Sequence, residues 1–387
     1  MKNVVLFLIG AYPSIGGVET ITTNLANEFV KCGMDVHIVS FEQTVELEKM
    51  NLDKKVRVKV LSKPVYSKSN KRQLRDYVRD HKINIVMNQW CLPFYTTMLI
   101  KYATKGKNCE IIQIHHNNPV TNARLKQIEI DLENGSLNRF FGFIRWHSVN
   151  FVSRLSLRYA YNFCDEFVVL SESFIIPFLK YIWKQKDDKV AVIPNSFSTE
   201  SDGKLYPKEK EIIFLGRIDY NQKRVRRIID IWNDLENDYP DWRLTIVGDG
   251  PDVKNVKEKV ATYGLKHVNF EGSQKPDKYL RRAPIMLLVS EYEGFGIVLA
   301  EAQSYGCVPI ALDSYSALHD IVESCNNGII IDYPYSKDKF VDAIKQCIDS
   351  EERLMQMALN GMKSVEKFNM NSVLDKWLKL FLHLGAV

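Results

Sequence analysis

The sequence predicts an α/β protein with two doubly wound parallel sheets. The chain of 387 residues is too long for one ordinary domain, and its apolar content of 45% is enough for two cores. Short apolar runs alternate with helix-length segments in both halves, as expected for parallel strands joined by crossover helices. A polar segment from Ser198 to Lys210 separates the two series. We therefore expect one domain at residues 1–195, a second at 196–370 and a final helical segment at 371–387.

Seven apolar runs of the N-terminal domain have the length of buried strands: Val4–Ile9, Val36–Ser40, Val56–Val60, Ile83–Met87, Glu110–Ile114, Glu166–Leu170 and Val190–Ile193. Ligands of such a sheet lie at the carboxyl ends of the strands, so polar residues that follow each run are candidate site residues. Gly16 and Gly17 follow the first run and lead into a helix from about Val18. Their spacing differs from the dinucleotide GxGxxG pattern, which disfavours a nicotinamide site.

Two further groups of polar residues follow strands of this domain. His115 and His116 follow the fifth run. A histidine there can donate a hydrogen bond to a sugar hydroxyl, and it titrates near neutrality. Asn88 and Trp90 follow the fourth run and are candidates for a ligand pocket, although core packing explains a tryptophan there equally well.

The N-terminal domain carries the positive charge of the chain. Residues 1–195 contain 27 Lys and Arg against 18 Asp and Glu, whereas the remainder contains 25 against 29. Such a surface favours an anionic partner. Residues 134–164 lack acidic side chains and mix arginines with aromatic residues, which is typical of a helix at an anionic membrane surface. A partly buried helix explains the same pattern, so both interpretations stay open.

Six apolar runs repeat the alternation in the second domain: Ile212–Leu215, Leu244–Val247, Val268–Glu271, Ile285–Val289, Val308–Leu312 and Ile329–Ile331. The first run is followed by Gly216 and Arg217, with Lys223 shortly after. Two cations at the carboxyl end of a strand can neutralise a diphosphate leaving group. The next arginines, Arg224, Arg226 and Arg227, are expected on the solvated side of the following helix.

The stretch from Glu293 to Glu301 has the most specific chemistry. Gly294 and Gly296 flank Phe295, so a ligand could reach main-chain N–H groups at the start of a helix. Those groups lack intrahelical partners and lie at the positive end of the helix dipole, which favours a phosphate. If the whole stretch were helical, the two glutamates would lie about 12 Å apart. Glycosidase carboxylates lie only about 5 to 9.5 Å apart, so the spacing favours separate roles.

The sequence EGFGIVLAE from Glu293 to Glu301 resembles the E-x(7)-E signature of glycosyltransferase family 4, the retaining nucleotide-sugar transferases of GT-B fold. The resemblance covers nearly the whole chain and is most specific from Gly216 to Asp313. It implies two Rossmann-like domains that face each other across a cleft. The first would bind the acceptor, the second would bind the donor, and the C-terminal helix would return to the first.

The resemblance also implies roles for individual residues. The expected catalytic residues are Glu293, Arg217, Lys223 and one of His115 and His116, with His116 preferred because asparagine follows it. The expected donor-binding residues are Gly16, Gly17, Gly216, Gly294, Phe295, Gly296, Ile297 and Glu301. Asn88 and Trp90 are the expected acceptor-binding residues. No Asp-x-Asp motif occurs, so we expect neither a metal nor another cofactor.

The expected reaction moves a hexose or N-acetylhexosamine from a nucleotide diphosphate sugar to an acceptor hydroxyl. We expect a UDP-sugar, with GDP-mannose as the alternative, and a lipid-linked oligosaccharide acceptor of bacterial surface polysaccharide synthesis. No zinc spacing, RNP-like run or helix-turn-helix pattern indicates a nucleic-acid partner. Seven scattered cysteines without a CxxC pair favour a cytosolic protein. No run approaches the ~20 apolar residues of a membrane span, so contact with the inner face of the plasma membrane would be peripheral.

Two other functions stay open from the sequence. One is a sugar-nucleotide epimerase or phosphorylase of the same fold. The other is a non-catalytic partner that binds a nucleotide sugar or a membrane.

Overall fold

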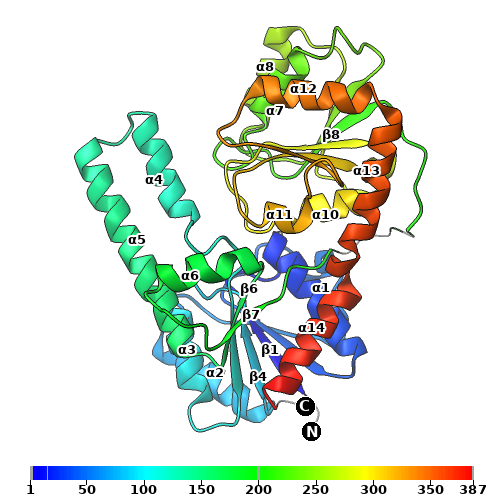
Figure 1. Ribbon diagram of the computed structural model, residues 1–387. Coiled ribbons are helices and arrows are strands. Elements are labelled where there is room, and N and C mark those ends of the chain that lie inside the picture. Colours follow the sequence, from blue (N-terminus) through cyan, green and yellow to red (C-terminus); the bar gives the residue numbers. More distant parts are fainter. Residues whose placement is uncertain (1–2, 15, 198–200, 202, 386–387) are drawn as a thin grey trace. The chain divides into compact units, whose positions relative to one another are not determined.

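The computed structural model describes residues 3–14, 16–197, 201 and 203–385 and shows two parallel-sheet units (Figure 1). Unit 1 consists of residues 1–195 and 371–387, and unit 2 consists of residues 196–370. In the described part of the chain, unit 1 has a sheet of seven strands and unit 2 a sheet of six. The predicted α/β class is confirmed. Residues 198–200 and 202 of the predicted polar segment lie outside the described residues.

The sheet of unit 1 has the order β3-β2-β1-β4-β5-β6-β7, and all neighbouring strands are parallel. Its strands are β1 (Val4–Leu8), β2 (Asp35–Ser40), β3 (Arg57–Val60), β4 (Ile85–Asn88), β5 (Glu110–Ile114), β6 (Glu166–Val169) and β7 (Val190–Val192). The strand order reverses between β1 and β4. Ligands of open α/β sheets bind outside the carboxyl ends of the strands at such a switch point.

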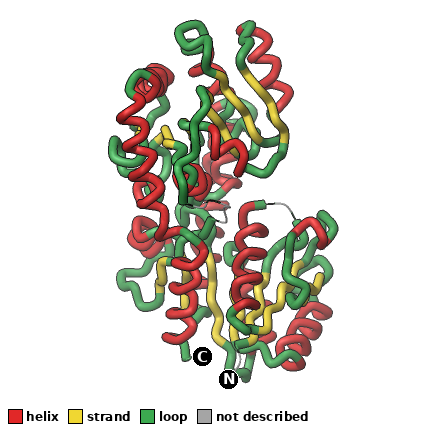
Figure 2. The backbone as a smooth tube through the Cα atoms, turned by 90° about the vertical axis from the view of Figure 1, so that its right-hand side faces the viewer, coloured by secondary structure: helices red, strands yellow, loops and turns green. Residues whose placement is uncertain are grey.

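Helices cover both faces of this sheet (Figure 2). The helices of this unit are α1 (Gly17–Lys31), η1 (Leu47–Met50), α2 (Lys68–Asp80), α3 (Phe94–Thr104), α4 (Ala123–Glu133), α5 (Arg139–Asn162), η2 (Glu172–Phe174), α6 (Ile175–Tyr181) and α14 (Met370–His383). The helix expected from about Val18 to Cys32 is α1.

The last helix, α14, completes the core of unit 1. Its buried residues Val373, Trp377, Leu380 and Phe381 recur every three or four positions and form one apolar face. The ring of Phe381 lies 5.4 Å from that of Phe29 in α1. Phe29 in turn stacks on Phe7 of β1 at 5.8 Å. The final segment therefore packs on the first helix and, through it, on the first strand.

The sheet of unit 2 has the order β10-β9-β8-β11-β12-β13 and is also parallel. Its strands are β8 (Glu211–Leu215), β9 (Arg243–Val247), β10 (Val268–Gly272), β11 (Ile285–Leu288), β12 (Val308–Leu312) and β13 (Ile329–Ile331). Its helices are α7 (Arg226–Asn233), α8 (Val253–Tyr263), α9 (Asp277–Arg282), α10 (Ile297–Ser304), α11 (Leu318–Ile321), α12 (Lys337–Ile348), α13 (Glu351–Ser364) and η3 (Val365–Phe368). The order reverses between β8 and β11, so the loops after these two strands lie at the switch point.

Candidate active site

The candidate site of unit 2 lies at the carboxyl edge of its sheet. The loop after β8 supplies Arg217 and Lys223, and the loop after β11 supplies Glu293 and the start of α10. Because β8 and β11 are neighbours in the sheet, these loops meet. Residues far apart in the sequence are therefore brought together at the switch point.

Asp219 fixes the conformation of the loop after β8. Its carboxylate accepts hydrogen bonds from the main-chain N–H groups of Gln222 at 2.6 Å and Lys223 at 3.2 Å. It also accepts one from the Arg217 guanidinium at 3.0 Å. The Asp219 side chain is only 8% exposed. The sequence analysis missed this residue, although an Asp that bonds the main chain a few positions later is a common turn signal.

The glycines after β8 and β9 allow two backbones to approach closely. Gly216 donates its N–H to the carbonyl of Val247 at 3.0 Å. A Cβ on Gly248 would lie 1.8 Å from the Gly216 carbonyl oxygen, and Gly248 has a φ of +144°. Only glycine fits there without a shift of the backbone. Gly216 therefore packs against Gly248 and supports the loop that carries Arg217 and Lys223.

Lys223 and Glu293, two predicted catalytic residues, pair with each other. The Lys223 ammonium lies 2.6 Å from Oε1 of Glu293, and the two side chains are 14% and 8% exposed. The Gln222 amide donates to the other carboxylate oxygen of Glu293 at 3.3 Å. Arg217 differs, because its side chain is 65% exposed. A diphosphate could therefore bind one exposed guanidinium, that of Arg217, and one largely buried ammonium, that of Lys223.

The turn before α10 places the helix start three residues after Gly294. Gly296 has a φ of +75° and precedes Ile297, the first residue of the helix, which is half-buried. Phe295 is buried against Phe368 of η3, with ring centroids 5.4 Å apart. Glu293 thus lies in the loop and not in the helix, so the axial spacing of about 12 Å does not apply to the two glutamates. The Leu299 N–H already donates to the Gly296 carbonyl at 2.9 Å, and the other main-chain N–H groups at the start of α10 remain suited to an anion.

Glu301 has an unusual environment within α10. It is half-buried, and its carboxylate makes no hydrogen bond or ion pair within the described residues. Burial, with a smaller contribution from the charge of Asp277, raises the pKa of Glu301 to about 7. Such a carboxylate gains from any ligand that offers hydroxyl donors.

The expectation for the arginines that follow Lys223 is wrong. Arg224 and Arg227 lie 3.6 Å and 2.9 Å from the Glu291 carboxylate, and Arg226 pairs with Asp252. These side chains are only 14% to 35% exposed. The helix pattern alone could not reveal partners that come from other loops.

In unit 1, both histidines lie at the carboxyl edge of β5. His115 is buried, and its Nδ1 lies 3.6 Å from the sulfur of Cys91. His116 is half-buried and is hydrogen-bonded to the side-chain oxygen of Gln89. Burial lowers the pKa of each to about 4, so both rings are neutral at pH 7. The greater exposure of His116 favours it as the ring that reaches a ligand, and its role stays a prediction.

Asn88 and Trp90 shape the carboxyl edge of β4. The Asn88 amide donates to Gln113 at 2.7 Å and to Thr96 at 3.2 Å, and its oxygen accepts the N–H of Trp90 at 3.1 Å. Asn88 is fully buried, so these bonds join β4 to β5 and fix the turn to Trp90. The half-buried ring of Trp90 covers Gly10, where a Cβ would lie 3.1 Å away. Their contact with an acceptor stays a prediction.

Gly16 and Gly17 open α1, as expected from the sequence. A Cβ on Gly16 would lie 2.2 Å from the carboxylate of Glu19, which therefore lies over this glycine. Burial raises the pKa of Glu19. Gly17 has no atom within 4 Å of the corresponding position. An anion that approached Gly16 would meet the Glu19 carboxyl, so donor binding by these glycines stays a prediction.

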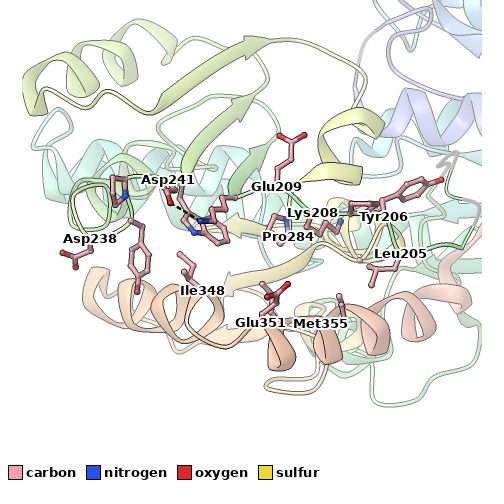
Figure 3. Close-up of a pocket in the computed structure, with 18 residues that line it drawn as sticks. Leu205, Tyr206, Lys208, Glu209, Asp238, Asp241, Pro284, Ile348, Glu351 and Met355 are labelled. Carbon is pink, nitrogen blue, oxygen red and sulfur yellow. Dashed lines mark hydrogen bonds and ion pairs between the residues drawn. The ribbon is translucent and has the colours of Figure 1, made fainter.

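A pocket of about 730 Å³ lies at the opposite edge of the unit 2 sheet (Figure 3). Its lining comes from segments that precede β8, β9, β11 and β12, and from α13. Lys208 in its wall donates to the carbonyls of Leu280, Arg281, Ala283 and Tyr305 at 2.7 to 3.1 Å. Burial lowers the pKa of Lys208 to about 8. Since these carbonyls end α9 and α10, Lys208 supports those helices, and the pocket is separate from the Glu293 site.

Two family models match the chain. The model described as Glycosyl transferases group 1 matches residues 197–364, and the model described as Glycosyltransferase Family 4 matches residues 15–201. The chain belongs to glycosyltransferase family 4. The family predicted from the Glu293 to Glu301 motif is therefore confirmed.

Named relatives of this glycosyltransferase agree with that assignment. It is 24% identical over 389 residues to an uncharacterized glycosyltransferase of Haemophilus influenzae. The match covers 97% of this chain and 99% of the Haemophilus protein. It is 25% identical over 229 residues to a Campylobacter jejuni enzyme named GalNAc-alpha-(1->4)-GalNAc-alpha-(1->3)-diNAcBac-PP-undecaprenol alpha-1,4-N-acetyl-D-galactosaminyltransferase. That match covers 59% of this chain and 62% of the Campylobacter protein.

Solved structures show the same fold. Anabaena HepE, in complex with UDP and glucose, has a TM-score of 0.75 at 15% identity and covers 99% of this chain and 100% of its own. A variant of S. aureus TarM, in complex with Fondaparinux, alpha-GlcNAc-glycerol and UDP, has a TM-score of 0.76 at 14% identity. That likeness covers 98% of this chain and 100% of the TarM chain. The predicted GT-B class is confirmed. No helix in the described part of the glycosyltransferase is long and apolar enough to cross a membrane.

Proposed function

We propose that the enzyme transfers a hexose or N-acetylhexosamine from a UDP-sugar to a hydroxyl of a lipid-linked glycan, with retention of configuration. The observation that carries the proposal is the cluster at the carboxyl edge of unit 2. There, Lys223, Glu293 and the start of α10 lie together, and Glu301 follows on the same helix. Complexes of HepE with UDP and of TarM with UDP support the choice of base.

The proposed donor site divides the nucleotide sugar among these groups. The diphosphate lies on the N–H groups at the start of α10, with Arg217 and Lys223 as cations. Glu301 accepts hydrogen bonds from the two ribose hydroxyls, which suits a carboxylate without other partners. Glu293 lies beside the transferred sugar. No step in this division needs a metal, and independence from metals stays a prediction.

In the proposed reaction, the bond between the anomeric carbon and the diphosphate oxygen breaks, and the acceptor oxygen forms a bond to that carbon from the same face. The acceptor proton passes to the departing phosphate oxygen. The cations and the helix start stabilise the negative charge that develops on the diphosphate. His116 beside the donor sugar is a role that only the family resemblance implies.

The proposed acceptor comes from the relatives and from the charge of unit 1. The Campylobacter relative is named for a substrate on a diphosphate-linked undecaprenol. Another relative is the lipopolysaccharide 1,6-galactosyltransferase of Salmonella typhimurium, 28% identical over 173 residues. An acceptor on a lipid diphosphate in bacterial surface polysaccharide synthesis would suit a basic N-terminal half. The enzyme would then work at the cytoplasmic side of the plasma membrane.

A donor screen tests the proposal. Purified enzyme is mixed with UDP-glucose, UDP-galactose, UDP-N-acetylglucosamine or GDP-mannose, and protection against heat and release of UDP or GDP are measured. We expect protection by UDP and by one UDP-sugar, and turnover that needs an acceptor lipid extract. Protection by GDP-mannose alone would identify GDP-mannose, and not a UDP-sugar, as the donor. Release of free sugar without any acceptor, or turnover with orthophosphate, would indicate an epimerase or a phosphorylase and not a transferase.

A further inference from the structure

Helices α4 and α5 form a hairpin whose free end lies away from the sheet of unit 1 (Figure 1). The C-terminal half of α5 packs on the unit, and its buried residues are Ser156, Leu157, Ala160 and Tyr161. In the N-terminal half only Gly142 is buried, and a Cβ there would lie 2.3 Å from Leu132 of α4. Trp146 adds a hydrogen bond to Glu129 at 3.0 Å. These contacts hold the hairpin together but leave its remaining faces open.

The open face of α5 carries an apolar patch. Its members are 46% to 68% exposed and are Phe140, Phe141, Phe143, Ile144, Phe151, Val152 and Leu155. Most of them recur at helical spacing, so they form one stripe along the helix. Single exposed apolar residues are normal, whereas seven on one projecting helix mark an interaction surface.

The charged residues of α5 itself are all arginines. Arg139 and Arg145 are exposed. Arg154 and Arg158 are engaged instead with main-chain carbonyls of Tyr181 and Ile182. The acidic residues closest in sequence lie on α4. Glu129 bonds Trp146 and Lys126, Asp131 accepts from Gln127 at 2.8 Å, and Glu133 is exposed. The exposed charges on the helix that carries the aromatic rings, Arg139 and Arg145, therefore favour an anionic surface.

We propose that this apolar patch docks the enzyme on an anionic lipid bilayer, with the phenylalanines at headgroup depth and Arg139 and Arg145 on lipid phosphates. The inference deepens the proposed function, since it names the surface that would present a lipid-linked acceptor. A symmetric contact between two copies would place the same patch on itself and bring the arginines together, which disfavours self-association. An amphipathic helix with rings and arginines has the composition that an interface requires.

Vesicle binding tests this proposal. Wild-type enzyme and a variant with Phe140→Ser, Phe141→Ser and Phe143→Ser are sedimented with vesicles of phosphatidylcholine, alone or mixed with phosphatidylglycerol. Wild type should prefer the anionic vesicles, and added salt should weaken its binding. The triple variant should bind about tenfold or more weakly, since partition follows buried apolar area. The matched control carries Met355→Ser and Leu359→Ser on α13, which are 50% and 47% exposed, and should bind like wild type.

Other outcomes would overturn the docking proposal. Equal binding of wild type and the triple variant would do so, as would equal binding to neutral and anionic vesicles. A triple variant that changes only the sedimentation coefficient, without a change in vesicle binding, would assign the patch to self-association. UDP protection against heat should be the same in all variants. If UDP does not protect the wild-type enzyme against heat, the donor assignment is refuted, and the vesicle result is unaffected.

A second observation is independent of the first and concerns Tyr315, in the loop after β12. Its side chain is buried, and its hydroxyl has no hydrogen-bond partner within the described residues. The hydroxyl points at the turn before α10, because a Cβ on Gly296 would lie 2.1 Å from it. Burial, followed by the charges of Glu293 and Asp313, raises the pKa of Tyr315 above its usual range. The hydroxyl is therefore a protonated donor close to the Glu293 carboxylate, and a buried donor without a partner is rare in native proteins.

We infer that Tyr315 is a positioning residue, which donates to Glu293 when a bound diphosphate draws Lys223 away. Without a diphosphate, Glu293 is held by Lys223 at 2.6 Å and by Gln222 at 3.3 Å. Once the ammonium turns to the phosphates, the buried carboxylate needs another donor, and Tyr315 lies at the same turn. The inference rests on the proposed donor site.

Tyr315→Phe tests the exchange of partners. The unliganded variant should melt at the same temperature as wild type or higher, because it loses only an unsatisfied hydroxyl. Its kcat should fall about tenfold, and the loss should disappear in a Glu293→Gln background. Tyr279→Phe is the control, since its hydroxyl bonds Glu271 at 2.8 Å, and this variant should melt at a lower temperature. A Tyr315→Phe variant that melts as low as the control, or whose kcat loss adds to that of Glu293→Gln, would overturn the inference.

Discussion

Replacement of Glu301 by Gln should stabilise the free enzyme and weaken donor binding at the same time. The ordinary pKa of 4.5 and the value of about 7 in the folded enzyme differ by an amount that corresponds to about 3 kcal/mol at 25 °C. The folded pKa is the higher one, so this carboxyl contributes stability below about pH 4.5 and loses it as pH rises to about 7. Above that pH, the ionised carboxylate is half-buried and has no hydrogen-bond or ion-pair partner in the described chain.

Glutamine has nearly the same shape but no charge to bury. Glu301→Gln should therefore raise the free energy of unfolding by up to about 3 kcal/mol near pH 8 and change it little near pH 5. If Glu301 binds ribose, the same variant should bind UDP about 10 to 150 times more weakly near pH 8, from a charged hydrogen bond of about 1.5 to 3 kcal/mol. UDP affinity of the wild type should rise as pH passes about 7, and the variant should lack that rise.

Urea unfolding and calorimetric titration with UDP, each at the two pH values, measure both effects. Glu258→Gln is the control, because this carboxylate is 62% exposed and its ion pair among the described residues is with Lys254 at 3.8 Å. It should change the stability by less than about 1 kcal/mol at either pH. A Glu301→Gln variant that is less stable near pH 8 would show that the carboxylate has a partner in the folded enzyme. Unchanged UDP affinity would remove Glu301 from the ribose site.

Four further substitutions test other parts of the site. Lys223→Ala and Arg217→Ala should each weaken UDP binding by about 1.5 to 3 kcal/mol in titration calorimetry, and unchanged affinity in both would remove the cations from the site. Glu293→Gln should lower kcat roughly a hundredfold with little change in UDP affinity, whereas near-normal activity would reduce the motif to a structural turn. Gly296→Ala should abolish UDP protection against heat, because the new Cβ would meet Tyr315 and the φ of +75° is strained. Gly264→Ala, with a φ of +68° but open space, should keep the protection.

The fold could be predicted because strand-length apolar runs and helix-length segments alternate throughout the chain. All thirteen predicted strands are present, and their observed ends differ from the predicted ends by at most two residues. A strand buried on both faces reads as a continuous apolar run, which makes its position clear even without an alignment. The order of strands within each sheet depends on contacts between distant segments and was not predicted.

The motif residues of the site could also be identified from the sequence, whereas the residues that contact them could not. Lys223 and Glu293 are 70 positions apart, and only the pairing of β8 with β11 brings them together. Tyr315 has no sequence signal, because its significance comes from the space beside Gly296. Gly296, which has a left-handed backbone conformation, ends the loop, so α10 begins at Ile297. The spacing of apolar residues did not reveal this helix start.

The most direct test of the central claim is transfer itself, followed on the product. Wild-type enzyme is incubated with the UDP-sugar found in the donor screen and an acceptor lipid extract, and the configuration of the new glycosidic bond is determined by NMR. We predict transfer that depends on both substrates and a product with the anomeric configuration of the donor. A product of inverted configuration would contradict the retaining reaction, and binding of UDP-sugar without any transfer would contradict the enzymatic function.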